Sequence, residues 1–216
     1  MSAVGGVGRL SFSRTELRDL VLAWLALGLA FTVFFARGGT GTLRLLAGGG
    51  FATALVVSLL TAGLGFLLHE LAHKVVAVRY GQVAEFRADF GMLFLAVISA
   101  LAGFIFAAPG AVYHRGRLTE REGGLIALAG PVTNLVLAAV FVPVFAAGLA
   151  VDSPLLSLVG GRGLGINLFL AAFNMLPFGA LDGKTVRSWS NAVFALVFVP
   201  SLVLTVVVVF VLGIGF

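Results

Sequence analysis

The sequence predicts an all-α polytopic membrane protein with about five to six transmembrane helices. Hydrophobic residues make up 60% of the 216 residues, charged residues make up 11%, and the mean hydropathy is +1.14. An average soluble domain is roughly 45–50% apolar and about 25% charged. The composition therefore excludes an ordinary soluble domain, and the length predicts one membrane-embedded domain over residues 1–216.

Six uncharged segments, separated by short charged connections, are the candidates for membrane insertion. About 20 residues of helix cross the hydrocarbon core of a bilayer, and several of the segments reach that length. They are residues 20–36, 51–68, 90–113, 123–151, 163–181 and 188–216. The first follows a group of arginines and has no small-residue cleavage site at its end, which is typical of an uncleaved anchor. Pro200 in the last segment leaves open one kinked span or a short hairpin.

Segment 90–113 determines the topology. It is too short for a hairpin of two full transmembrane helices, and Gly91, Gly103, Pro109 and Gly110 interrupt it. We therefore expect a re-entrant or interfacial element that makes no net crossing, with β structure as one form it can take. Irregular backbone at that depth must be covered by protein or line a wet cavity.

The distribution of basic residues supports this topology. With a cytoplasmic amino terminus and no net crossing by segment 90–113, eleven of the 14 Lys and Arg residues lie on the cytoplasmic side. The remaining three are Arg37, Arg44 and Arg162. A single crossing by that segment would divide the 14 basic residues seven to seven, which discards the positive-inside bias. We therefore expect a multi-pass protein with a cytoplasmic amino terminus.

The charge and the cysteine content exclude several function classes. The net charge of +5 comes from basic residues placed between apolar segments rather than from one patch, so it indicates orientation in a membrane and not nucleic-acid binding. The chain contains no cysteine, which excludes a disulfide, a thiolate metal ligand and a cysteine nucleophile. Any metal ion must be bound by nitrogen and oxygen atoms.

The most informative motif is His69-Glu70-Leu71-Ala72-His73, which continues the apolar segment 51–68. On a helix, residues four apart share a face, so His69 and His73 can bind one zinc ion. Glu70 is then free to deprotonate a metal-bound water. At 1.5 Å per residue, His73 lies about 9 Å from the charged end of the helix at Arg79. We expect the neighbouring Lys74 to extend its ammonium group toward the interface.

A catalytic zinc site normally has three protein ligands, so a third must lie elsewhere in the chain. Asp182 is the best candidate, because it ends an apolar segment broken by Pro177 and Gly179 on the expected face of His73. The other carboxylates have simpler explanations: Glu85, Asp89, Glu120 and Glu122 lie among arginines, and Asp152 lies in an outer turn. His114 is expected to be a solvated interface residue.

These motifs resemble the site-2 protease family of intramembrane zinc metalloproteases. The HExxH pattern of the family is met by His69, Glu70 and His73, and its Asn-x-x-Pro-x-x-x-Leu-Asp-Gly pattern is met over residues 174–183. A third element, Ala129-Gly130-Pro131 with Asn134, is similar to the Gly-Pro helix of the family. The resemblance covers roughly residues 51–187. The form of the family that the sequence resembles is a compact one, without a PDZ-like or nucleotide-sensing domain.

The resemblance implies one Zn²⁺ per chain, bound by His69, His73 and Asp182, with Glu70 as the general base. It implies that Asn174 positions the substrate or stabilises the developing oxyanion, although this asparagine can instead bond to its own broken helix. The expected substrate is a transmembrane segment of a membrane-anchored protein, cleaved near the cytoplasmic face, and no cofactor other than zinc is implied. Nothing in the sequence predicts the oligomeric state.

Other functions remain open at this stage. A membrane metalloprotease whose third ligand is a later glutamate is disfavoured, because no glutamate follows Glu122. A transporter would be expected to show repeated discontinuous helices, and no repeat is visible. The remaining alternative is a proteolytically silent membrane scaffold or metal-binding relative, against which the presence of Glu70 argues.

Overall fold

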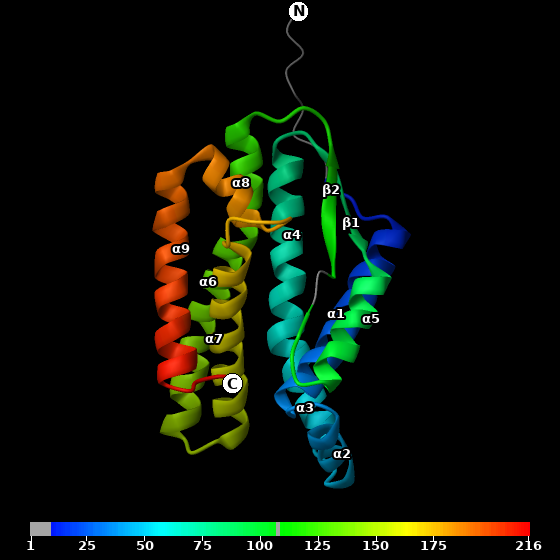
Figure 1. Cartoon of the computed structure of the whole chain (residues 1–216), viewed down its shortest axis with the longest axis vertical. Coiled ribbons are helices and arrows are strands. Elements are labelled where there is room, and N and C mark those ends of the chain that lie inside the picture. Colours follow the sequence, from blue (N-terminus) through cyan, green and yellow to red (C-terminus); the bar gives the residue numbers. More distant parts are fainter. Residues whose placement is uncertain (1–9, 107–108) are drawn as a thin grey trace, which may run out of the picture.

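The structure, a computed structural model, describes residues 10–106 and 109–216. Its helices are α1 (Arg14–Phe35), α2 (Gly39–Ala47), α3 (Phe51–Ser58), α4 (Leu64–Arg79), α5 (Phe90–Leu101), α6 (Glu120–Ala150), α7 (Pro154–Asn174), α8 (Asp182–Trp189) and α9 (Asn191–Thr205), with π-helical turns η1 (Leu59–Gly63) and η2 (Val206–Val211). Strands β1 (Val83–Ala88) and β2 (Gly110–Arg115) pair antiparallel. The fold is therefore a bundle of helices with one small sheet (Figure 1).

Five helices in the described part of the chain are long and apolar enough to cross a membrane. They are Arg14–Phe35, Phe51–Arg79, Glu120–Ala150, Pro154–Asn174 and Asn191–Val211. The second combines α3, η1 and α4 into 29 continuous helical residues, and the fifth combines α9 and η2. The predicted fold class is confirmed, and the segment around Pro200 forms one continuous span rather than a hairpin.

Segment 90–113 enters the bundle and returns. The helix α5 has only 12 residues and packs beside α1, and β2 then runs back to pair with β1 (Figure 1). The register pairs Val83 with Arg115 and Ala88 with Gly110. The predicted re-entrant element with β structure is thus present in the described residues, but its first strand, β1, lies before the predicted segment.

Two carboxylates of α1 attach this element to the bundle. Glu16 accepts a hydrogen bond from the backbone nitrogen of Phe86 at 3.0 Å, and Asp19 accepts one from that of Ala88 at 3.3 Å. Glu16 also forms an ion pair with Lys74, which donates a further hydrogen bond to the carbonyl of Ser11 at 2.6 Å. These contacts join α1, β1 and α4.

The expected extension of Lys74 toward the interface is wrong. The residue is 1% exposed, and its ammonium group is paired inside the protein with Glu16. The reason is that a carboxylate of α1 lies within reach, and an opposite charge compensates for burial of the ammonium group. The N-terminal segment contributes as well, because the Phe12 ring centroid lies 4.0 Å from the Lys74 nitrogen.

The helices α6 and α7 form a closely packed antiparallel hairpin. α6 begins with a capping box in which Thr119 and Glu122 satisfy each other's backbone nitrogens. The turn between the helices contains Asp152 at a φ of 50°, and Ser153 caps α7. Small residues let membrane helices approach closely, and Gly148 and Gly160 stand at such contacts here.

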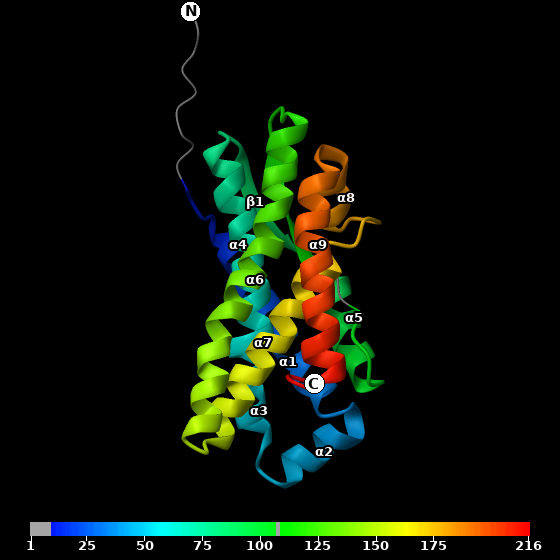
Figure 2. The same ribbon diagram turned by 90° about the vertical axis from the view of Figure 1, so that its left-hand side faces the viewer.

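The ends of the long helices and the connecting elements gather at two opposite ends of the molecule. The amino-terminal ends of α1 and α6 and the carboxy-terminal end of α4 lie toward one end of the molecule, together with α8, as both views show (Figures 1 and 2). α2 and the α6–α7 turn lie at the opposite end. The two sequence motifs, one at α4 and one at α8, are therefore brought to the same half of the bundle.

Candidate metal centre

Three side chains from α4 and α8 converge on one point. The Nε2 atoms of His69 and His73 lie 3.2 and 3.4 Å from Oδ2 of Asp182. One ligand atom from each residue lies within 4.8 Å of the other two, so the group can hold a metal ion. Both histidines are buried, at 4% and 8% exposed. The residues selected from the sequence as ligands are brought together.

The chain between α7 and α8 folds so that Asp182 reaches the histidines. α7 ends at Asn174, and Met175 is fully buried against Ala127 and Val186. Gly179 has a φ of +64°, a conformation that favours glycine. Gly183 follows Asp182 and packs directly on the carbonyl of Met175, where a side chain would not fit. The loop thereby fixes the start of α8.

Hydrogen bonds orient both imidazole rings. The Nδ1 atom of His73 lies 2.7 Å from the carbonyl of Ile126, and a carbonyl can only accept, so Nδ1 carries the proton. The Nδ1 atom of His69 lies 2.6 Å from Oδ1 of Asn134, whose amide nitrogen donates to the Gly65 carbonyl at 3.1 Å. Each neutral ring therefore directs the lone pair of Nε2 at Asp182, as metal ligands of this type do.

The electrostatics of this group fit a cation. The Asp182 side chain is 18% exposed and lies against both imidazole rings. Its Oδ2 atom is buried and accepts no hydrogen bond from the described residues. Three lone pairs directed at one point repel one another unless a cation lies between them. Two nitrogens and one oxygen are a donor set that suits zinc.

The helix α6 comes unusually close to the metal centre at Gly130. A β-carbon built at this position would lie 2.5 Å from Nε2 of both His69 and His73. Only glycine leaves that space free. Gly130 therefore lets α6 cover one side of the two histidines, while Ile126 and Asn134 on the same helix accept the hydrogen bonds that the rings donate.

The other predicted residues are placed as follows. Glu70 lies on α4 between the two histidines and is 8% exposed. Asn174 donates from its amide to the carbonyl of Leu170 at 3.0 Å, so in this structure it bonds to its own helix. His114 is exposed on β2 and lies outside the metal centre.

Asn167 is a buried polar residue beside the metal centre that the sequence did not lead us to predict. It is fully buried, accepts a hydrogen bond from the amide of Asn134 at 2.9 Å and donates to the carbonyl of Gly163 at 2.8 Å. The available signal was an asparagine inside an apolar segment, since buried polar groups in membrane helices find partners. The hydrogen bonds from His69 to Asn134 and from Asn134 to Asn167 thus link α4, α6 and α7.

A multi-pass helical protein with a buried His-His-Asp centre and an adjacent glutamate has the features of a membrane-embedded metalloprotease. The sequence is 40% identical over 194 residues to a protein of Methanocaldococcus jannaschii named "Putative zinc metalloprotease MJ0611", an alignment that covers 88% of this chain and 92% of that protein. Two further relatives have similar names. YwhC of Bacillus subtilis is 34% identical, in an alignment that covers 60% of this chain and 65% of that protein. Rip3 of Mycobacterium tuberculosis is 34% identical, in an alignment that covers 67% of this chain and 32% of that protein.

The chain belongs to the site-2 protease family, whose members are zinc metalloproteases. No protein-family model matches the sequence, and no solved structure matches it. The cofactor predicted from the sequence, zinc, agrees with the names of the relatives and with the His69, His73 and Asp182 group.

Proposed function

We propose that the chain is a zinc-dependent intramembrane endopeptidase that cleaves transmembrane segments near the cytoplasmic face. The observation that carries the proposal is the position of two of the three candidate ligands, His69 and His73, on Phe51–Arg79, a helix long and apolar enough to span a membrane. His73 is six residues from the end of that helix at Arg79, or about 9 Å along its axis. The ligands are His69, His73 and Asp182, and the amino terminus is cytoplasmic.

Glu70 is the general base and later the general acid. Zinc in this centre supplies a lowered pKa for a coordinated water and polarisation of a peptide carbonyl. The Glu70 carboxylate accepts a proton from the attacking water and returns it to the nitrogen of the leaving amine. Asp182 and the two histidines would hold the zinc ion, and the hydrogen bonds that the rings donate to Asn134 and Ile126 keep the rings in place.

The substrate binds as an extended strand beside β2. The outer edge of β1 is covered by α1, because the backbone nitrogens of Phe86 and Ala88 donate to Glu16 and Asp19. Val112 is paired with Phe86 in the register, so its own backbone nitrogen and carbonyl point away from β1. An extended peptide can add to such an edge. A helical substrate must first unwind locally, since its backbone groups are already hydrogen-bonded.

Proline at position 112 tests the strand addition. Val112→Pro removes one backbone donor from the open edge and leaves the β1–β2 ladder intact, so we expect the cleavage rate to fall about two- to tenfold, the net effect of losing one hydrogen bond. Zinc content should be unchanged. Tyr113→Phe, which alters a neighbouring exposed side chain but no backbone donor, is the matched control. Unchanged cleavage by Val112→Pro would show that the substrate binds elsewhere.

The base is tested by Glu70→Gln in the purified zinc-loaded protein, with a single-span model substrate in detergent. Loss of general base catalysis is expected to lower the cleavage rate by about 10²–10⁴-fold. Glu120→Gln changes an exposed glutamate in the first turn of α6 and should cleave like the unaltered chain. If the zinc-loaded chain and Glu70→Gln both fail on several substrates, the silent scaffold or metal-binding relative is the better description.

A further inference from the structure

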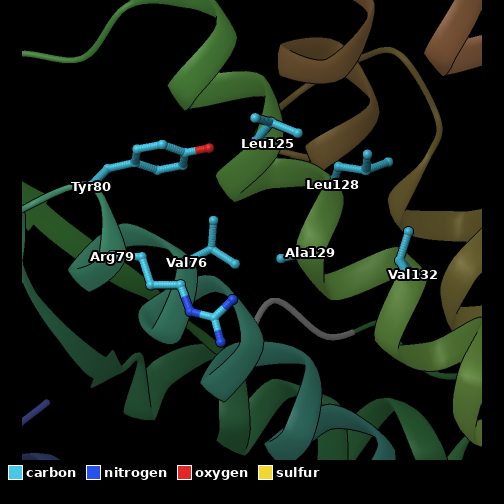
Figure 3. A pocket seen from close by; sticks show the side chains of 7 residues that line it. All are labelled: Val76, Arg79, Tyr80, Leu125, Leu128, Ala129 and Val132. Atoms are coloured by element: carbon cyan, nitrogen blue, oxygen red, sulfur yellow. The ribbon is translucent and has the colours of Figure 1, made fainter.

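A groove separate from the metal centre lies between α4 and α6. Its lining is Val76, Arg79 and Tyr80 at the end of α4, and Leu125, Leu128, Ala129 and Val132 on α6 (Figure 3). The volume is about 330 Å³, and none of the three metal-ligand candidates contributes to the lining. The groove is therefore a second candidate binding site, on the opposite side of α4 from Lys74.

The lining combines apolar walls with one cation. Five of its seven residues are aliphatic, and the lining includes no carboxylate. Arg79 and Tyr80 are exposed, and Arg79 forms no ion pair with the described residues. A ligand that matches this surface has an apolar body and an anionic group that accepts hydrogen bonds.

The groove lies at the membrane depth where a lipid places its anionic headgroup and the start of its apolar chains. Arg79 is the last residue of the spanning helix Phe51–Arg79, and the spanning helix Glu120–Ala150 begins five residues before Leu125. The mouth is thus at the polar ends of both helices, the level of lipid headgroups. From Leu125 to Val132 the apolar wall extends about 10 Å along α6 toward the hydrocarbon core.

We propose that this groove binds an acidic phospholipid, with its phosphate at the Arg79 guanidinium and one acyl chain along Leu125, Ala129 and Val132. A guanidinium group forms paired hydrogen bonds with phosphate oxygens. A zwitterionic headgroup adds a cation for which the lining has no anionic partner. The bound lipid contacts both helices and holds them together.

This position couples the lipid to the metal centre. Val76 lies one turn beyond His73 on α4, and Ala129 precedes Gly130, which packs on both histidines. The same α4–α6 contact contains the hydrogen bond from His73 to the Ile126 carbonyl. A lipid that bridges the two helices therefore stabilises the geometry of the histidines.

The test measures lipid binding directly and does not depend on proteolysis. The full chain is delipidated in detergent and titrated with phosphatidylglycerol or phosphatidylcholine of the same acyl chains, and bound lipid is counted by native mass spectrometry. We expect one phosphatidylglycerol to bind at least about fivefold more tightly than phosphatidylcholine at low salt, and Arg79→Gln to remove that preference. Arg115→Gln, at an exposed arginine near the same end, is the matched control. The thermal unfolding midpoint should rise with phosphatidylglycerol only where Arg79 is present.

Three results would overturn the proposal. Equal binding of the two lipids, or equal loss of binding in Arg79→Gln and Arg115→Gln, would mean that the groove does not select an acidic lipid. Competition by inorganic phosphate at the same concentration as the lipid would show a phosphate site without an acyl-chain contact. Normal zinc content and normal gel filtration of Arg79→Gln establish that the variant is folded, so a loss of binding reports the groove itself.

Discussion

Alanine at position 130 is expected to abolish high-affinity zinc binding. Its β-carbon would lie 2.5 Å from Nε2 of both His69 and His73, the two atoms that are directed at the metal. Zinc itself needs about 2.0–2.1 Å to each of these nitrogens, so the methyl group competes for the coordination space. Either α6 moves away, and the hydrogen bonds that the rings donate to Asn134 and Ile126 are lost, or the rings rotate. We expect zinc affinity to fall about 100-fold, the upper end of the loss that follows removal of such orienting contacts.

Gly123→Ala provides the matched control for this experiment. It adds the same methyl group to the same helix, but its nearest neighbour would be Cγ2 of Thr185 at 4.0 Å, an ordinary contact. Metal analysis after purification should give close to one zinc per chain for Gly123→Ala and very little for Gly130→Ala. Stoichiometric zinc in Gly130→Ala, with the unaltered cleavage rate, would mean that the ligands are not arranged as described.

The metal centre was predictable because its motifs are local. Helical spacing alone places His69 and His73 on one face, and the pattern over residues 174–183 places Asp182 at the end of a broken helix. The charge distribution of the chain then places both motifs at the same end of the bundle. These inferences need only helical geometry and the cost of burying charge in a bilayer.

The contacts that the sequence did not predict are all between distant segments. Lys74 meets Glu16 from 58 residues away, and Asn134 meets Asn167 from α7. Neither pairing has a local signal, because it depends on which faces of α1, α4, α6 and α7 pack together. The strand β1 was missed for a similar reason. Its six residues, Val83–Ala88, become a strand only because β2 and the carboxylates of α1 accept their hydrogen bonds.

Removal of the Lys74 ammonium group is expected to destabilise the fold strongly. Lys74→Met leaves Glu16, which is 1% exposed, as a buried charge without its counterion. Breaking such a pair from one side costs about 3–5 kcal/mol. In Lys74→Met/Glu16→Gln no charge remains, and the glutamine oxygen can still accept from the Phe86 nitrogen, so we expect most of the stability to return. The measurement is the free energy of reversible unfolding of each variant, in mixed micelles of one composition.

The pair of Arg87 and Glu85 serves as the control, because its side chains are 41% and 32% exposed. Arg87→Met should change stability by at most about 1 kcal/mol, since solvent screens exposed ion pairs. The double variant is informative for function as well, because Glu16 attaches β1 to the helix that bears His73. If the double variant regains stability and zinc but cleaves at scattered positions, the ion pair positions the strand β2 relative to the metal. If Lys74→Met is as stable as Arg87→Met, the ammonium group and Glu16 are not paired inside the bundle, and the attachment of β1 to α4 must depend on other contacts.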